Sequence, residues 1–170
     1  MKILVVFYSR TGKTRKVAEE LRNSLDCDIE ELIDTKSRSG PIEYIRAARD
    51  AGKHKLTVLE KIKNDPANYD LIIIGTPNWA DTMAMAVRTY ITENYMKFNN
   101  VAFFETAGRN NFDGAFSDMK ELIGSNPLAV MGVRSKEVNN GIYKTKVVEF
   151  LKKINSSWKI IKKLNFYIKE

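Results

Sequence analysis

Residues that build metal centres and nucleophilic catalytic sites are scarce in this sequence. It holds one cysteine, Cys27, and one histidine, His54, among 170 residues. A single cysteine cannot form a disulfide within the chain, and a lone histidine without a cluster of cysteines or carboxylates does not make a metal site. We therefore expect Cys27 to be a small core residue and His54 a surface residue, with no metal ligand and no catalytic side chain. Any redox chemistry must then come from a bound cofactor.

Long apolar runs and a leader segment are also missing. No stretch reaches the roughly 20 apolar residues that a membrane-spanning helix needs. Met1-Lys2 leads directly into an apolar run, which leaves no room for a signal peptide. With 44% hydrophobic residues, the chain is large enough for one well-buried domain. The expectation is a cytoplasmic protein without a membrane span.

Acidic residues are outnumbered, since 28 Lys and Arg stand against 21 Asp and Glu, for a net charge of +7. Residues 151–170 contain six lysines and one glutamate, so this tail holds +5 and the rest of the chain +2. A basic tail can contact nucleic acid, anionic lipid or an acidic protein. No recognisable nucleic-acid-binding motif accompanies it, so we expect no nucleic-acid partner.

Apolar runs alternate with amphipathic segments along the chain. Between the second and third expected strands, Ser39-Gly40-Pro41 and Gly52 bound one additional helix. Alternation of this kind predicts a parallel sheet covered by helices on both faces. The expected strands lie near 2–8, 28–33, 71–75, 100–105 and 128–133, and the other expected helices near 13–25, 83–96, 114–123 and 138–154.

The first expected strand leads into the loop Ser9-Arg10-Thr11-Gly12-Lys13-Thr14 and then into an amphipathic helix. A helix N-terminus offers free N–H groups and the positive end of the helix dipole, so we expect an anion at this loop. The loop matches only the second half of the nucleotide P-loop, because Phe7 stands where the leading glycine belongs. A plain turn with a helix cap is the alternative interpretation.

Two more polar loops follow later strands. Thr76-Pro77-Asn78-Trp79-Ala80 follows the third strand, and Thr106-Ala107-Gly108-Arg109-Asn110 follows the fourth. Ligands bind an open parallel sheet at the carboxyl ends of its strands, so these loops should converge with the loop from Ser9 to Thr14. Trp79 is well placed to stack on a flat ring, although a loop tryptophan can also simply cover the core. Gly108 would let the backbone pass close to such a ring.

The three loops, in this order, make the chain similar to the flavodoxin family from Met1 to Ile154. Ser9 to Thr14 fills the family's phosphate-loop pattern, Ser/Thr-x-Thr-Gly-x-Thr, at every specified position. The resemblance implies an α/β fold, namely a flavodoxin-like doubly wound five-stranded parallel sheet in the order 2-1-3-4-5. It also implies FMN as the cofactor, with Ser9 to Thr14 on the phosphate and with Pro77 to Ala80 and Thr106 to Arg109 around the isoalloxazine ring. We take all residues of the three loops as candidate cofactor-binding residues.

The chain continues past the point where flavodoxins normally finish. We divide it into a flavodoxin-like FMN-binding domain, 1–154, and a basic amphipathic C-terminal extension, 155–170. We predict that the extension docks an acidic redox partner or joins copies of the chain into a homo-oligomer, and the alternative is that it folds back onto the domain. Its apolar residues recur at nearly helical spacing, at Trp158, Ile161, Leu164 and Ile168.

The resemblance implies an FMN-dependent electron-transfer flavoprotein, a flavodoxin in the broad sense, that shuttles electrons between redox partner proteins. The alternative is an enzyme of the same fold, an NAD(P)H-dependent FMN or quinone reductase. A separate dinucleotide fingerprint, G-x-G-x-x-G, is missing from the sequence, and this favours the carrier. Flavodoxins are commonly acidic, so the net charge of +7 is a departure from the family.

Overall fold

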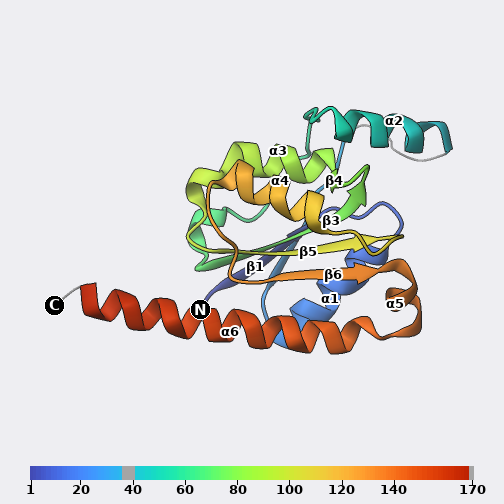
Figure 1. The fold of residues 1–170 in the computed structure, drawn as a ribbon. Coiled ribbons are helices and arrows are strands. Elements are labelled where there is room, and N and C mark those ends of the chain that lie inside the picture. Colours follow the sequence, from blue (N-terminus) through green and yellow to red (C-terminus); the bar gives the residue numbers. More distant parts are fainter. Residues whose placement is uncertain (36–40, 169–170) are drawn as a thin grey trace.

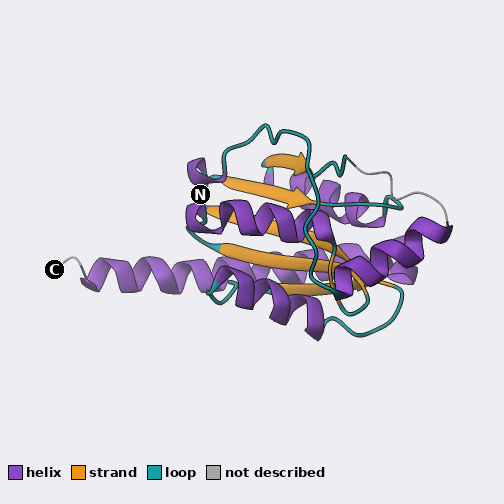
Figure 2. Cartoon of the chain, turned by 90° about the horizontal axis from the view of Figure 1, so that it is seen from above, coloured by secondary structure: helices purple, strands orange, loops and turns teal. Residues whose placement is uncertain are grey.

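Five parallel strands form the central sheet, in the order that the sequence predicts. The structure, a computed structural model, describes the backbone of residues 1–35 and 41–168 and the side chains of 1–35 and 45–161. A sixth strand of two residues, β4 (Thr82–Met83), pairs antiparallel with β3 and was not predicted. The fold class is confirmed. The sheet order is β2 (Asp28–Glu31), β1 (Ile3–Phe7), β3 (Leu71–Trp79), β5 (Val101–Ala107) and β6 (Val130–Arg134) (Figures 1 and 2).

Helices cover both faces of this sheet (Figure 1). The α1 face carries α1 (Lys13–Leu25), α5 (Ser135–Asn140) and α6 (Tyr143–Ile168). The α3 face carries α2 (Pro41–Gly52), α3 (Met85–Asn94) and α4 (Asp113–Ile123). Short 3-10 turns, Pro66–Asn68 and Tyr95–Lys97, complete the described elements. The expected helix start at Ser39-Gly40 lies outside the described residues.

Side chains that alternate between the two faces of the strands form two apolar cores, one on each side of the sheet. In β1, Leu4 and Val6 pack into the core under the α3 face, whereas Val5 and Phe7 pack into the core under the α1 face. Successive side chains of a strand point to opposite faces, so a continuous apolar run is what a sheet buried on both sides requires. Cys27 is half-buried beside the α1-face core, where burial raises the pKa of its thiol to about 11. His54 is exposed, as expected.

The third strand is longer than predicted. The segment after residue 75 was expected to be a loop, but β3 continues to Trp79 because β5 pairs with it as far as Pro77 and β4 closes a hairpin on it. The two residues between β3 and β4, Ala80 and Asp81, have φ of 53° and 63°. Positive φ at both central residues is what a type I′ hairpin turn requires.

The last helix crosses the predicted domain boundary. Gly141, at φ 83°, separates α5 from α6, and α6 then runs without a break from Tyr143 past residue 154 to Ile168. Ser157 donates a hydrogen bond to the Leu128 carbonyl oxygen at 3.0 Å, so the first turns after residue 154 still contact the domain. The side chains of residues 162–170 are outside the described part. Figures 1 and 2 show the end of α6 projecting past the sheet, opposite the carboxyl ends of the strands.

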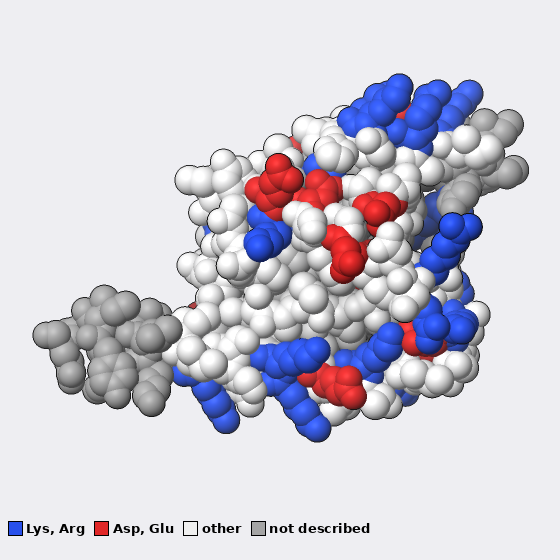
Figure 3. All heavy atoms as spheres, in the orientation of Figure 1, with Lys and Arg blue, Asp and Glu red and all other residues white. Residues whose placement is uncertain are grey.

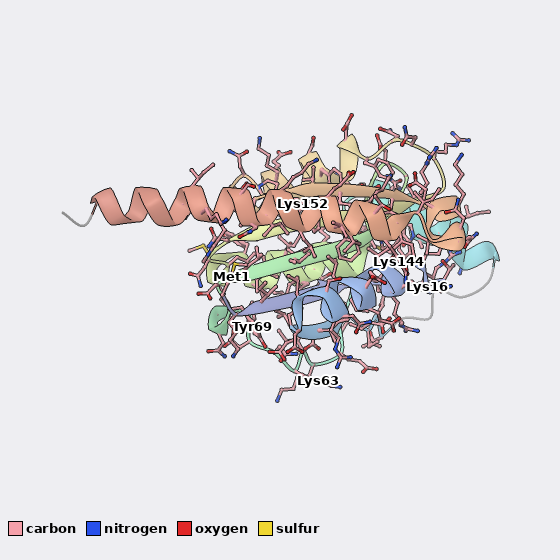
Figure 4. The ribbon with its side chains drawn as sticks, turned by 90° about the horizontal axis from the view of Figure 1, so that it is seen from below. Met1, Lys16, Lys63, Tyr69, Lys144 and Lys152 are labelled. Atoms are coloured by element: carbon pink, nitrogen blue, oxygen red, sulfur yellow. The ribbon has the colours of Figure 1, made fainter. Side chains whose placement is uncertain are left out.

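The end of the sheet where the parallel strands begin lies far from the three loops. Figure 4 shows Met1 and Tyr69 at this end of the sheet and Lys144 towards the opposite end. There α1 and α6 lie side by side, and Lys144 pairs with Glu20 of α1 at 3.5 Å. Among the described helices, none is both long and apolar enough to cross a bilayer.

Candidate functional site

The loop after β1 presents hydrogen-bond donors that the protein itself does not use. Gly12 adopts φ 81° and α1 begins at the next residue. Ser9 Oγ accepts a hydrogen bond from the Arg15 N–H at 3.2 Å and so caps the helix from the loop. Within the described part of the chain, the backbone amides of residues 11–14 donate to no protein atom. These amides, at the positive end of the α1 dipole, suit an anion.

The three predicted loops meet around one cavity of about 270 Å³. A buried hydrogen bond joins two of its walls, since Thr14 Oγ1 on α1 lies 2.8 Å from Thr106 Oγ1 on β5. Gly108, on the rim, has open space where a Cβ would stand. The lining residues are Arg10, Thr11, Lys13, Thr14, Pro77, Asn78, Trp79, Thr106, Ala107, Gly108 and Ser135.

Six predicted residues lie outside the cavity lining, and the structure gives some of them other roles. Ser9 caps α1 and Gly12 provides its left-handed entry. Thr76 is fully buried, and its Oγ1 accepts the Ala84 N–H at 2.9 Å, so it holds the β3–β4 hairpin. The other three are Ala80, Arg109 and Asn110.

Ser135 was missed by the sequence reasoning. It follows directly after β6, the fifth parallel strand, whose carboxyl end lies at the same edge as the others. The rule that ligands bind at the carboxyl ends of parallel strands could have found it, because the rule applies to all five strands and only three loops were considered.

Trp79 forms a wall of the cavity and is not a protruding loop residue. Only 5% of it is exposed, and its ring meets the Tyr8 ring edge-on, with centroids 5.5 Å apart and planes at 86°. It belongs to the apolar core under the α3 face. The stacking role expected for Trp79 therefore stays a prediction. Trp79 would have to stack on the ring from the packed position that it occupies here.

Ion pairs around the buried Glu137 fix the corner that presents Ser135. Glu137 Oε2 accepts the Arg134 backbone N–H at 2.7 Å and Lys146 Nζ at 2.8 Å, and Oε1 accepts the Arg134 guanidinium at 2.7 Å. Burial alone would raise the pKa of Glu137, but these donors outweigh it and hold the pKa at about 2. Nearby, Lys13 Nζ donates to Asn139 Oδ1 at 2.8 Å, which anchors the loop after β1 to α5.

A buried ion pair holds the β3–β4 hairpin from the other side. Arg88 of α3 pairs with Asp118 of α4, and the same guanidinium donates to Thr82 Oγ1 of β4 at 3.1 Å. The pair lies 7% and 13% exposed. It ties two helices to the short strand, so the hairpin that carries Asn78 and Trp79 is clamped in place.

Another buried titratable group, Glu105 of β5, is hydrogen-bonded to the hairpin. It is 0% exposed, and its Oε1 accepts a hydrogen bond from Asn78 Nδ2. Burial, with smaller contributions from Asp81 and Asp113, raises the pKa of Glu105 to about 8 even though the Asn78 bond lowers it. At neutral pH this carboxyl is mostly a neutral acid.

No family model and no curated protein sequence matches the chain. Among solved structures, it is similar to a flavoprotein in complex with FMN from Lactobacillus acidophilus NCFM, with 26% identity over 82% of this chain and 97% of that one, at a TM-score of 0.68.

Two flavodoxins share the fold at lower identity. A flavodoxin, WrbA-like protein from Agrobacterium tumefaciens is 13% identical, covers 93% of this chain and 98% of its own, and has a TM-score of 0.57. Oxidised flavodoxin 2 from Bacillus cereus is 16% identical. The match covers 88% of this chain and 99% of that one, at a TM-score of 0.51. The resemblance drawn from the sequence is confirmed: the chain has a flavodoxin-like fold, and these solved structures that it resembles are flavoproteins.

Proposed function

We propose that this protein binds FMN and carries electrons between redox partner proteins without transforming a substrate of its own. The observation that carries the proposal is the cavity in which unused amides of residues 11–14 meet the loops after β3 and β5. The structural neighbour in complex with FMN supports it. FMN, when bound, would supply the electron-accepting and electron-donating ring.

The residues present fit a phosphate monoester. The free amides, the Thr11 and Thr14 hydroxyls and the Lys13 ammonium are all donors, and a phosphate offers only acceptors at neutral pH. In the Thr14–Thr106 pair one hydroxyl donates to the other, which leaves the second proton for the ligand. The ring would lie between the Trp79 wall and the Gly108 loop, where the clamped hairpin excludes water from one side.

The rim of the cavity favours an acidic partner. Arg10 and Lys13 line the cavity and Arg109 is exposed beside it. Figure 3 shows further Lys and Arg side chains gathered over α2 and along the end of the molecule that carries the loops. We propose that an acidic redox partner docks at this end, because opposite charges steer encounter. The distal end of α6 lies at the other end of the molecule, so the predicted docking role of the tail does not extend to the cavity.

Titration of the apoprotein with flavins tests the cofactor. We expect FMN to bind more tightly than phosphate-free riboflavin, and Thr11→Val to weaken FMN while leaving riboflavin unchanged. Thr11 is exposed in the free protein, and the loss of a donor that FMN covers on binding corresponds to about 1–3 kcal/mol. Equal affinities for FMN and riboflavin would refute the phosphate site.

Anaerobic mixing of the FMN-loaded protein with NADH or NADPH separates the carrier from the reductase. The carrier proposal expects no rapid reduction of the flavin by either nucleotide. Rapid reduction by one of them would establish the NAD(P)H-dependent reductase in its place.

A cytoplasmic location is part of the same proposal, and fractionation of the cells that produce the protein tests it.

A further inference from the structure

Glu105 is a buried acid with half of its hydrogen-bonding capacity unused. Its Oε1 is bonded to Asn78, but its Oε2 is buried and has no hydrogen-bond partner among the described residues. Alternation along β5 places it on the α3 face with Phe103, one residue before Thr106, which lines the cavity. Buried carboxyl oxygens are almost always satisfied, so an unpartnered one calls for an explanation.

Asn78 connects this acid to the cavity. Its Nδ2 donates to Glu105, its Oδ1 accepts the Asp81 N–H at 3.1 Å, and the residue itself lines the cavity. Both ends of the Asn78 amide therefore have hydrogen-bond partners, and Glu105 determines that the N–H₂ group points towards β5. A change in the charge of Glu105 acts directly on the residue that borders the ligand.

The charges around Glu105 do not neutralise it. Asp81 comes from the hairpin turn and Asp113 from the first turn of α4, and both disfavour a further negative charge. On the same face Arg88 is paired with Asp118. On the opposite face Lys146 donates to the carbonyl of Gly132, the strand neighbour of Glu105, and this lysine is paired with Glu137.

No lysine or arginine in the described part of the chain forms an ion pair with Glu105. Taking a carboxylate out of water without a counter-ion is costly, so burial favours the protonated form of Glu105. The neighbouring strands add no charge of their own, since Thr76 and Gly132 are its register partners in β3 and β6.

We propose that Glu105 is a buried proton-binding residue that positions Asn78 and couples the protonation of the protein to the charge of the molecule in the cavity. When the occupant gains negative charge, the neutral acid is favoured and a proton is held; when Glu105 loses its proton, a negative occupant is disfavoured. The two effects are equal by linkage. The part that concerns reduced FMN, whose ring gains negative charge, rests on the proposed function.

The proton site is tested first in the apoprotein. A folded pKa above the unfolded one means that stability is lost as pH rises between the two values. From pH 5.5 to 7.5 the unfolding equilibrium constant of the wild type should rise about tenfold more per pH unit than that of Glu105→Gln, which cannot titrate. Glu121→Gln, an exposed carboxyl on α4, is the matched control and should follow the wild type.

A measurement on the wild type alone guards against a variant that fails to fold. The carboxyl carbon of Glu105, followed by 13C NMR in glutamate-labelled protein, should titrate near pH 8. Titration below pH 5, or parallel stability curves for wild type and Glu105→Gln, would overturn the proposal whatever FMN does.

The coupling is tested with the loaded protein. Potentiometry gives the affinity for reduced FMN relative to oxidised FMN, and this ratio should fall at least about fivefold from pH 7 to pH 9 in the wild type beyond its fall in Glu105→Gln. If Glu105 titrates near pH 8 but the two proteins show the same change, the coupling is wrong while FMN binding stands. If FMN does not bind at pH 7, the proposed function and the coupling both fail, and the apoprotein titration still decides the proton site.

Discussion

We expect Glu137→Gln to destabilise the protein strongly at neutral pH and much less in acid. Glu137 has a side chain only 5% exposed and accepts hydrogen bonds from Arg134 and Lys146. Glutamine has nearly the same shape, but it carries no charge and places an N–H₂ group against donors. The two cations then lose the anion that holds the β6–α5 corner, where Ser135 borders the cavity.

The magnitude follows from the lowered pKa. The folded value is about 2 and the ordinary value is 4.5, and one pH unit corresponds to about 1.36 kcal/mol. Above pH 4.5 the carboxylate is ionised in both states and contributes roughly 3 kcal/mol of stability. As the pH falls from 4.5 towards 2, the unfolded chain takes up the proton first, so the contribution shrinks to roughly 1.4 kcal/mol at pH 3.

Urea unfolding at pH 6 and pH 3 measures this difference. Glu137→Gln should be less stable than the wild type by about 3 kcal/mol at pH 6 and by about 1 kcal/mol at pH 3. The exposed Glu121→Gln should stay within about 0.5 kcal/mol of the wild type at both. A loss of equal size at the two pH values would show that the glutamine misfits sterically and that the charge network contributes nothing.

Three substitutions examine the β3–β4 hairpin. Gly114→Ala would place a Cβ 2.0 Å from the Asp81 carbonyl oxygen, so the turn must shift. We expect this variant to bind FMN more weakly in a titration, and an unchanged affinity would contradict the close approach. Ala80→Gly relieves a side chain at φ 53° and should raise stability by about 1 kcal/mol in urea, whereas a loss would contradict the left-handed turn. Asp118→Asn leaves Arg88 buried without a counter-ion and should cost about 3 kcal/mol by the same assay, and a neutral result would show the pair to be dispensable.

The positions of the strands and of the loop after β1 could be predicted because they depend on local pattern. The apolar run of β1 is followed by Gly12 and an amphipathic helix, and α1 begins and ends at the predicted residues. Parallel strands then bring their carboxyl ends to one edge whatever the details of packing. Ten of the predicted residues consequently line the cavity.

The buried acids could not be predicted from pattern. Glu105 ends an apolar run and Glu137 stands in a polar segment, and both look like ordinary surface carboxyls in the sequence. Glu105 depends on a partner far along the chain, since Asn78 is 27 residues away, whereas Arg134 and Lys146 are 3 and 9 residues from Glu137. Only the assembled fold shows that Glu137 meets two cations and that Glu105 meets none among the described residues, and hence that their pKa values move in opposite directions.

The hairpin turn shows why local rules fail at this site. A two-residue turn with positive φ normally uses Asn-Gly or Asp-Gly, and Ala80-Asp81 offers neither. Tertiary contacts impose the conformation: Asn78 Oδ1 accepts the Asp81 N–H, Asn111 Nδ2 donates to Asp81 Oδ1 at 2.9 Å, and Gly114 leaves room for the Asp81 backbone. The left-handed conformation costs about 1–2 kcal/mol per residue, so these contacts must offset it. A turn held in this way keeps Asn78 and Trp79 fixed at the cavity, which a glycine turn with its wider choice of conformations would do less firmly.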